Sequence, residues 1–396
     1  RTQFKRLRQF ADHVSDWSKV WHLDFSIDKT QVVVFTGKRN YEPPKPISIC
    51  GNEVSYATHY RYLGLTFQVN GKWSRQFDAV VTKCSITANV IGRINHRCKP
   101  PSPMITVSLV KAILIPQMAY AIEFWRLTKT QERKLNQILA SPLRRAFGLP
   151  RCASAIRTLW EAGVPTITSV RHTGLLQAVS RAHRSAMNGH LLPQLLAGDL
   201  TTDASVISSY FCRPFAREFH AFKSKFQQLK DCSFPLSKKL IRSVSAASME
   251  REWRVCASDK AKRIKVDVGT AAHVVADGKP LACVRTRLRL GVALTPAQHH
   301  RYKHVPSPNC EKCGVFGSDR HVLLDCPLTE QARRVCASAL EALPFDVPLT
   351  YELILGHAPT PPRQFAKERK FLNIIHTRCL EITGEFLLAI DRLLHL

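Results

Sequence analysis

The chain has 396 residues, of which 45% are apolar and 22% are charged, so it can form a packed core and is not disordered as a whole. It carries 58 Lys and Arg against 30 Asp and Glu, and the resulting net charge of +28 indicates a polyanionic partner such as RNA or DNA. No apolar run reaches the ~18 residues that span a bilayer, and the mean hydropathy is −0.14, which argues against a membrane protein.

Segment 1–72 is predicted to hold one helix and a small antiparallel sheet. Apolar side chains recur at steps of three and four over 3–22, which is typical of a helix with one apolar face. The valine-rich run 31–35 predicts a strand. Alternation over 47–54 around a Gly-Asn pair predicts a short hairpin, and 60–67 is expected to form one further strand.

From residue 73 the spacing changes to that of long helices, which form a predicted helical domain, 73–190. Ser102 and Pro103 mark one helix start, because serine caps the first turn and proline fits the position after it. Between 126 and 157 the chain is strongly basic, with Glu132 as its one acid. The expected helices are 74–97, 103–125, 129–147 and 166–190.

The remaining chain divides into a basic connector, 191–280, and a C-terminal domain, 281–396. The connector has weaker periodicity, and we expect one helix in it near 245–263. The C-terminal domain begins with a basic strand or helix at 283–291. Its further expected helices are 328–343 and, after a proline-rich break at 359–362, 364–395.

Cys310, Cys313, His321 and Cys326 form the clearest motif of the chain, Cys-x2-Cys-x7-His-x4-Cys. Three thiolates and one imidazole suit tetrahedral zinc, and because four ligands leave no open position the zinc would be structural. His321 and Cys326 are five residues apart, about 140° around an ideal helix, so they would not share a helical face. Pro327 disfavours the α conformation at Cys326, which allows the thiol to turn back to the metal.

Two alternatives to this zinc site stay open. The cysteines can be unrelated buried residues beside a lone Cys-x-x-Cys, or an upstream histidine, His299, His300 or His304, can supply the nitrogen. Most of the 13 cysteines lie singly in apolar stretches, as buried thiols do in a reducing compartment. The predicted fold class is α+β: mostly helical, with a small antiparallel sheet at the N-terminus and a C-terminal zinc knuckle.

Short motifs follow one another along the chain, among them Lys29-Thr30, Tyr62-Leu63-Gly64-Leu65 and Arg287-Leu288-Arg289-Leu290-Gly291. In this order they resemble the C-terminal part of the reverse transcriptase of non-LTR (LINE-type) retrotransposons. Lys29-Thr30 leads into a strand, as at the end of the family's palm, although Ser26 stands where the family usually has asparagine. Tyr62-Leu63-Gly64-Leu65 is similar to the hairpin that follows. The other similar segments are 149–154 and 161–165, in the helical thumb, and 287–291 and 321–327, in the terminal zinc knuckle.

The resemblance implies an RNA-directed DNA polymerase, whose clustered aspartates hold two Mg²⁺ ions. The family's Phe/Tyr-Ala-Asp-Asp element is expected upstream of Arg1, in a longer polypeptide. Residues 10–13 read Phe-Ala-Asp-His, but they lie in a helical pattern close to Lys29 and lack the second aspartate, so we interpret Asp12 as a helix-surface carboxylate. This chain alone is not expected to polymerise, and Mg²⁺ belongs only to the full-length enzyme.

The candidate nucleic-acid contacts are cations. The resemblance places Lys29 near the incoming nucleotide, and the alternative is a strand-edge lysine. Thumb and knuckle arginines are expected to contact phosphates, or to form an ordinary solvated basic face. These arginines are Arg144, Arg145, Arg151 and Arg157 in the thumb, and Arg287, Arg289 and Arg301 before the knuckle. Tyr302 and Phe316 either stack on unpaired bases or pack the small core of the knuckle.

Two functions remain in view. The first is the C-terminal fragment of a retrotransposon reverse transcriptase that grips template–primer nucleic acid. The second is a non-enzymatic, zinc-stabilised RNA- or DNA-binding protein co-opted from such an element. For both functions we expect RNA or DNA as the partner and an intracellular, nuclear location. We expect neither membrane binding nor a small-molecule substrate for this chain.

Overall fold

A computed structural model describes residues 2–36, 46–97, 102–125, 127–187, 235–256, 269–365 and 367–394, with residues 223, 224, 226 and 229. The chain forms two compact units, residues 1–83 and 84–396. Much of the predicted connector, including 191–222 and 257–268, lies outside the described residues. The four-part division of the chain stays a prediction.

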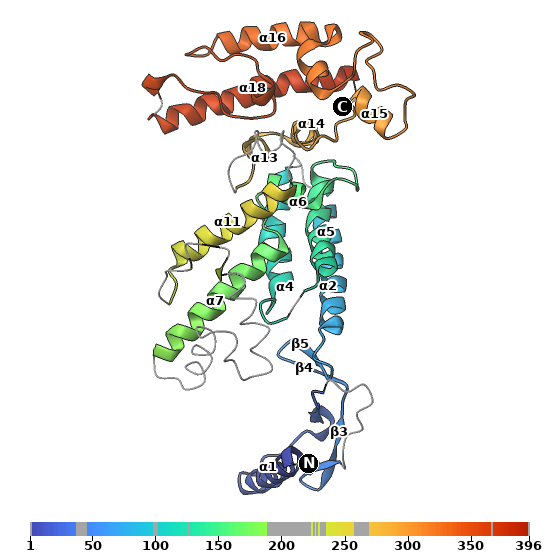
Figure 1. Ribbon diagram of the computed structural model, residues 1–396, viewed down its shortest axis with the longest axis vertical. Helices are drawn as coiled ribbons and strands as arrows, with labels where there is room; N and C mark the ends of the chain where they lie inside the picture. The colour runs from blue at the N-terminus through green and yellow to red at the C-terminus, as the bar shows by residue number, and fades with distance from the viewer. Residues whose placement is uncertain are drawn as a thin grey trace. The chain divides into compact units, whose positions relative to one another are not determined.

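The first unit holds helix α1, two small sheets and the first part of the long helix α2 (Ser74–Arg97) (Figure 1). In the three-stranded sheet the order is β1-β3-β2: β2 pairs antiparallel with β3, as predicted, whereas β1 pairs parallel with it. The elements are α1 (Thr2–Val20), a 3-10 turn (Ile27–Lys29), β1 (Gln31–Val32), β2 (Ile47–Ile49), β3 (Asn52–Tyr56), β4 (His59–Tyr62) and β5 (Leu65–Gln68).

The predicted strand 60–67 is an antiparallel hairpin, β4–β5, turned by Leu63 and Gly64. Their φ angles are +47° and +84°, and two successive positive φ values give the tight turn whose twist matches that of paired strands. Sequence alternation does not indicate such a turn when a leucine occupies its first position.

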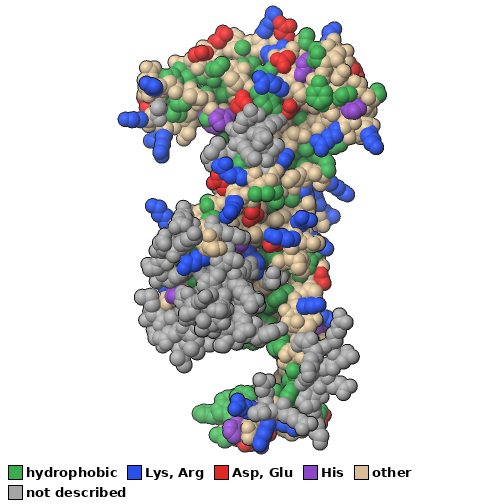
Figure 2. Space-filling model, viewed as in Figure 1, with side chains coloured by type: hydrophobic (Ala, Val, Ile, Leu, Met, Phe, Trp, Pro, Cys, Tyr) green, Lys and Arg blue, Asp and Glu red, His purple; other side chains and the backbone are tan. Residues whose placement is uncertain are grey.

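Helix α1 packs on β2 and leaves its opposite face open. Ala11 of α1 and Ile47 of β2 are buried, and the backbone N–H of Cys50 donates to Ser15 Oγ at 2.8 Å. On the open face Phe10 and Trp17 are 65% and 50% exposed. Figure 2 shows hydrophobic side chains gathered on this helix.

The second unit begins with a helical region that matches most of the predicted helices. The predicted helix 103–125 is shorter and includes a π-turn, Val110–Leu114, and Ser102 caps its start by accepting from the N–H of Met104. Helices α7 and α11 lie side by side (Figure 1), joined by hydroxyl groups. The helices are α2 (Ser74–Arg97), which crosses the boundary between the units, α3 (Pro103–Leu109), α4 (Ile115–Ala119), α5 (Lys129–Ala146), α6 (Ala155–Glu161), α7 (Ile167–Met187) and α11 (Lys238–Cys256).

The C-terminal helices of this unit share one apolar core. Leu288, Leu323, Leu340 and Leu387 are among its buried side chains, and they come from four different segments. The segment expected as a strand or helix at 283–291 is a helix, α14. The elements are α13 (Ala272–Ala276), α14 (Lys279–Leu290), α15 (Pro296–Arg301), a π-turn (His321–Asp325), a 3-10 turn (Pro327–Thr329), α16 (Glu330–Glu341), α17 (Tyr351–Ile354), a 3-10 turn (Arg363–Phe365) and α18 (Arg369–Leu394).

The fold is mostly helical with a small sheet near the N-terminus, as expected. None of the helices in the described residues is long and apolar enough to cross a bilayer.

Candidate functional site

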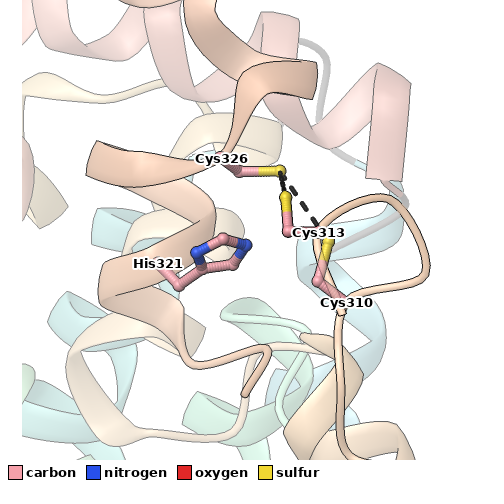
Figure 3. Close-up of side chains that lie close together, drawn as sticks. All are labelled: Cys310, Cys313, His321 and Cys326. Carbon is pink, nitrogen blue, oxygen red and sulfur yellow. Dashed lines mark hydrogen bonds between the residues drawn. The ribbon is translucent and has the colours of Figure 1, made fainter. Parts of the chain in front are cut away.

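The structure brings the four predicted metal ligands together. The ligand atoms of Cys310, Cys313, His321 and Cys326 all lie within 4.8 Å of one another, with the His321 ring turned toward the three sulfurs (Figure 3). The sulfur of Cys326 lies 3.8 Å from each of the other two. Sulfurs bound to one tetrahedral zinc at ~2.3 Å lie about 3.8 Å apart. The donor set and its spacing therefore fit a zinc ion.

A tight loop positions the first two cysteines. The N–H of Cys310 donates to Val315 O at 2.8 Å, and the N–H of Gly314 donates back to Cys310 O at 2.8 Å. Gly314 has a φ of +70°, which glycine adopts without a Cβ clash. This loop closes on itself and places Cys313 opposite Cys310.

A π-turn, His321–Asp325, positions the other two ligands. The N–H of Cys326 donates to His321 O at 2.8 Å, a bond between residues five apart that brings their backbones to the same side of the turn. Cys326 itself is extended, with φ −69° and ψ 128°, as predicted for a residue before Pro327. The π-turn therefore brings His321 and Cys326 to the same side, which an ideal α-helix would not do.

Neighbouring side chains fix this turn in place. Ser318 Oγ accepts from the N–H of His321 at 3.1 Å. The carbonyl of Cys326 accepts from Arg333 Nη1 at 2.8 Å and from Thr329 Oγ1 at 3.0 Å. Sequence analysis missed Thr329 and Arg333, although their positions three and seven residues after Cys326, on a predicted helix start, were a usable clue.

The charge balance of the cluster favours a bound cation. Burial raises the pKa of Cys310, but contacts with the His321 side chain and nearby backbone amides outweigh it and lower the pKa to about 7. Burial and the neighbouring Cys326 and Cys310 thiols raise the pKa of Cys313 to about 11. Adjacent thiols resist joint ionisation, and a divalent ion removes that penalty.

The histidine nitrogen supports the same conclusion. Within the described residues, His321 Nε2 is a buried nitrogen with no hydrogen-bond partner. The cluster does not include the upstream histidines considered as alternatives. Two of these, His299 and His304, instead contact each other, Nδ1 to Nδ1, at 3.3 Å.

Two of the arginines predicted to contact nucleic acid are buried, which corrects that prediction for them. Arg144 donates from Nη2 to Ala153 O at 2.6 Å and is 8% exposed. Arg289 is 4% exposed and pairs with Glu161 at 3.0 Å. A guanidinium enclosed by its own chain is not accessible to a phosphate.

Two further arginines are partly buried and bond the backbone. Arg157 donates to Cys256 O at 3.1 and 3.0 Å, and Arg287 donates to Gly148 O at 2.9 Å. Each contact ties distant segments of the second unit together. Arg157 and Arg287 therefore have a structural role in the fold, in addition to any contact with nucleic acid.

The remaining candidate cations are exposed. Arg145 donates to Asn89 at 2.6 Å across α5 and α2, and Arg151 and Arg301 lie on the surface. Lys29 ends the 3-10 turn before β1 and is also exposed. More Lys and Arg than acidic side chains are visible on this face of the molecule (Figure 2).

The two aromatic candidates differ in burial. Tyr302 is partly buried, with its hydroxyl 3.7 Å from the Cys152 sulfur. Phe316 is 60% exposed and does not pack the core of the knuckle.

The chain was compared with known proteins. No protein-family model matches it. The search of curated proteins also found no match.

Proposed function

We propose that this chain is the C-terminal part of an RNA-directed DNA polymerase of the non-LTR retrotransposon type, and that it grips template–primer nucleic acid. The observation that carries the proposal is a four-ligand Cys/His cluster in a chain of net charge +28. The ordered motifs that resemble this family supply the polymerase assignment. In this proposal the catalytic aspartates and their Mg²⁺ ions belong to another part of the full-length enzyme.

The metal in this proposal is zinc, with a structural role. Cys310, Cys313, His321 and Cys326 would complete its tetrahedral coordination, which leaves no position for a substrate. When bound, zinc would stabilise the thiolates and cross-link the loop to the π-turn. Val322 of that turn is 1% exposed in the apolar core, so the cross-link extends to the C-terminal helices.

The exposed cations would supply nucleic-acid affinity without reading sequence. Arg145, Arg151 and Arg301 are the thumb and knuckle arginines that remain on the surface. Arginines that contact phosphates release counterions, so the affinity depends steeply on salt. Lys29 stays in the proposal as a contact near the incoming nucleotide.

The open face of α1 also supports the polymerase proposal. Phe10 and Trp17 on this helix and Trp21 directly after it are 65%, 50% and 64% exposed. Apolar patches of this kind mark surfaces that another segment covers. In the proposal that segment is the remainder of the palm.

A second function, a non-enzymatic RNA- or DNA-binding protein, rests on a separate observation. In the described ranges, the Cys310 cluster is the one group of three or more His, Cys, Asp or Glu placed to hold a metal ion. A basic chain stabilised by such a cluster can bind nucleic acid without catalysis. Preference for a primer–template junction over single strands favours the polymerase proposal, and equal affinity favours the second function.

Binding as a function of salt tests both functions. Fluorescence anisotropy with a labelled primer–template would be measured between about 50 and 300 mM salt. We expect affinity to fall steeply with salt, and the double variant R145A/R151A to reduce the slope by about two, as for two lost phosphate contacts. The matched control is R334A, because Arg334 is an exposed arginine paired with Glu330. Undetectable binding at 100 mM salt would contradict both functions.

A further inference from the structure

Phe316 is an exposed aromatic ring beside the metal cluster. It is 60% exposed, and Val315 before it is 51% exposed. An exposed phenylalanine ring does not gain the free energy of burying its apolar surface. Val315 and Phe316 thus form an adjacent exposed apolar pair in the cysteine loop of a knuckle that has few core residues of its own.

The backbone around the ring is fixed from both sides. Phe316 forms an isolated β-bridge with Asn309, and the N–H of Gly317 donates to Pro308 O at 3.0 Å. The N–H of Ala297 donates to Gly317 O at 3.1 Å. A Cβ on Gly317 would come within 2.5 Å of Pro296 Cβ, so the loop sits tightly against the start of α15. The ring is thus presented on a rigid support and loses little backbone entropy on binding.

The segment that carries the ring, 301–320, is basic along the chain. Four exposed cations lie within this segment: at the end of α15 and just after it, in the cysteine loop, and just before the π-turn. Of the two acids in this segment, Glu311 is exposed and Asp319 accepts a hydrogen bond from the Tyr351 hydroxyl. The four cations are Arg301, Lys303, Lys312 and Arg320.

We propose that Phe316 stacks on an unpaired base of single-stranded RNA or DNA whose phosphates lie along these cations. An exposed ring flanked by positive charge is the combination that binds single strands. Bases within a duplex already stack on both faces, so the ring requires an unpaired nucleotide. This inference rests on the proposed function and names the form of nucleic acid that the knuckle takes.

The test compares variants of Phe316 in the zinc-loaded full chain. The probes are short RNA and DNA single strands containing 2-aminopurine, and the matching duplexes. We expect F316L to weaken single-strand binding by about 5- to 150-fold, the range for loss of one stacked base, and to remove the quenching of 2-aminopurine. F316W should retain both properties. Because leucine keeps the apolar volume, F316L isolates stacking from folding, and zinc content checks that the knuckle is intact.

Two further variants act as controls. V335A removes a side chain that is 62% exposed on α16, outside the segment, and should leave affinity unchanged. K312A should reduce the salt dependence of binding, which F316L leaves unaltered.

The outcomes separate this inference from the proposed function. Equal single-strand affinity for F316L and wild type overturns the stacking role of Phe316 and leaves the proposed function standing. Equal losses for single strands and duplexes also overturn it, because they indicate a general change in the surface. Failure of the wild-type chain to bind any of the probes contradicts the proposed function itself. RNA and DNA probes show which polymer is preferred.

Discussion

Replacing Arg289 by methionine tests the interior of the second unit. Arg289 forms two hydrogen bonds with the Glu161 carboxylate, at 3.0 and 3.2 Å, and a third with Leu355 O at 2.6 Å. The side chains of Arg289 and Glu161 are 3% and 7% exposed. The variant R289M leaves a buried carboxylate and a buried carbonyl without these donors.

The expected cost is large because the remaining charge stays buried. Removal of one partner of a buried ion pair lowers the free energy of unfolding by about 3–5 kcal/mol. Replacement of both partners by apolar residues is often neutral, so E161M/R289M should be more stable than R289M. We expect the two sites to be coupled by roughly 2 kcal/mol or more, whereas R334M on the surface should change stability by about 0.5 kcal/mol at most.

Urea unfolding of wild type, R289M, E161M and E161M/R289M, followed by circular dichroism, closes the double-mutant cycle and measures this coupling, with R334M as the surface control. Salt-dependent nucleic-acid binding, measured on the folded R289M variant, should keep the wild-type slope. A loss below 1 kcal/mol for R289M, or a changed binding slope with unchanged stability, would refute the assignment of Arg289 to the interior.

Two other predictions concern a buried acid and the metal site. Burial raises the pKa of Glu252 to about 7, although a hydrogen bond from the Thr166 hydroxyl opposes the shift. The folded chain therefore keeps a proton on this carboxyl that the unfolded chain releases near pH 4.5. Stability should therefore fall as pH rises from about 4.5 to 7, and E252Q should exceed wild type by ~1–3 kcal/mol at pH 8 but not at pH 4.5, in urea titrations. R333M removes a hydrogen-bond donor to Cys326 O and should weaken zinc binding about 10- to 100-fold, measured by chelator competition. R334M is the control and should keep the wild-type zinc affinity. Equal zinc affinities for R333M and wild type would show that Arg333 does not position Cys326.

The helices were largely predictable because their apolar periodicity is strong. The predicted helix 74–97 matches α2, and 364–395 contains α18, because each buries one continuous apolar face. The residue pattern over 60–67 predicted one strand and missed the β4–β5 hairpin, because its turn depends on a positive φ at Leu63 that propensity does not favour. The family resemblance at 62–65 did imply a hairpin there. The parallel pairing of β1 with β3 is a tertiary contact that alternation along a strand cannot indicate.

The candidate metal site was predictable in its ligands but not in its backbone. The spacing of three cysteines and one histidine identified the ligand set, while the π-turn from His321 to Cys326 depends on packing of Val322 and Leu323 in the core. The buried arginines were misjudged because net charge says nothing about individual exposure. Glu161, an acid among apolar residues, was the available clue, since a buried carboxylate requires a cation.

The metal content of the full chain, purified without chelators and measured by mass spectrometry, tests the central claim most directly. We predict one zinc per chain, lost in C310S and H321A but retained in C152S, whose sulfur lies outside the cluster. Absence of zinc from the folded wild-type chain, or equal zinc in all four proteins, would contradict the account.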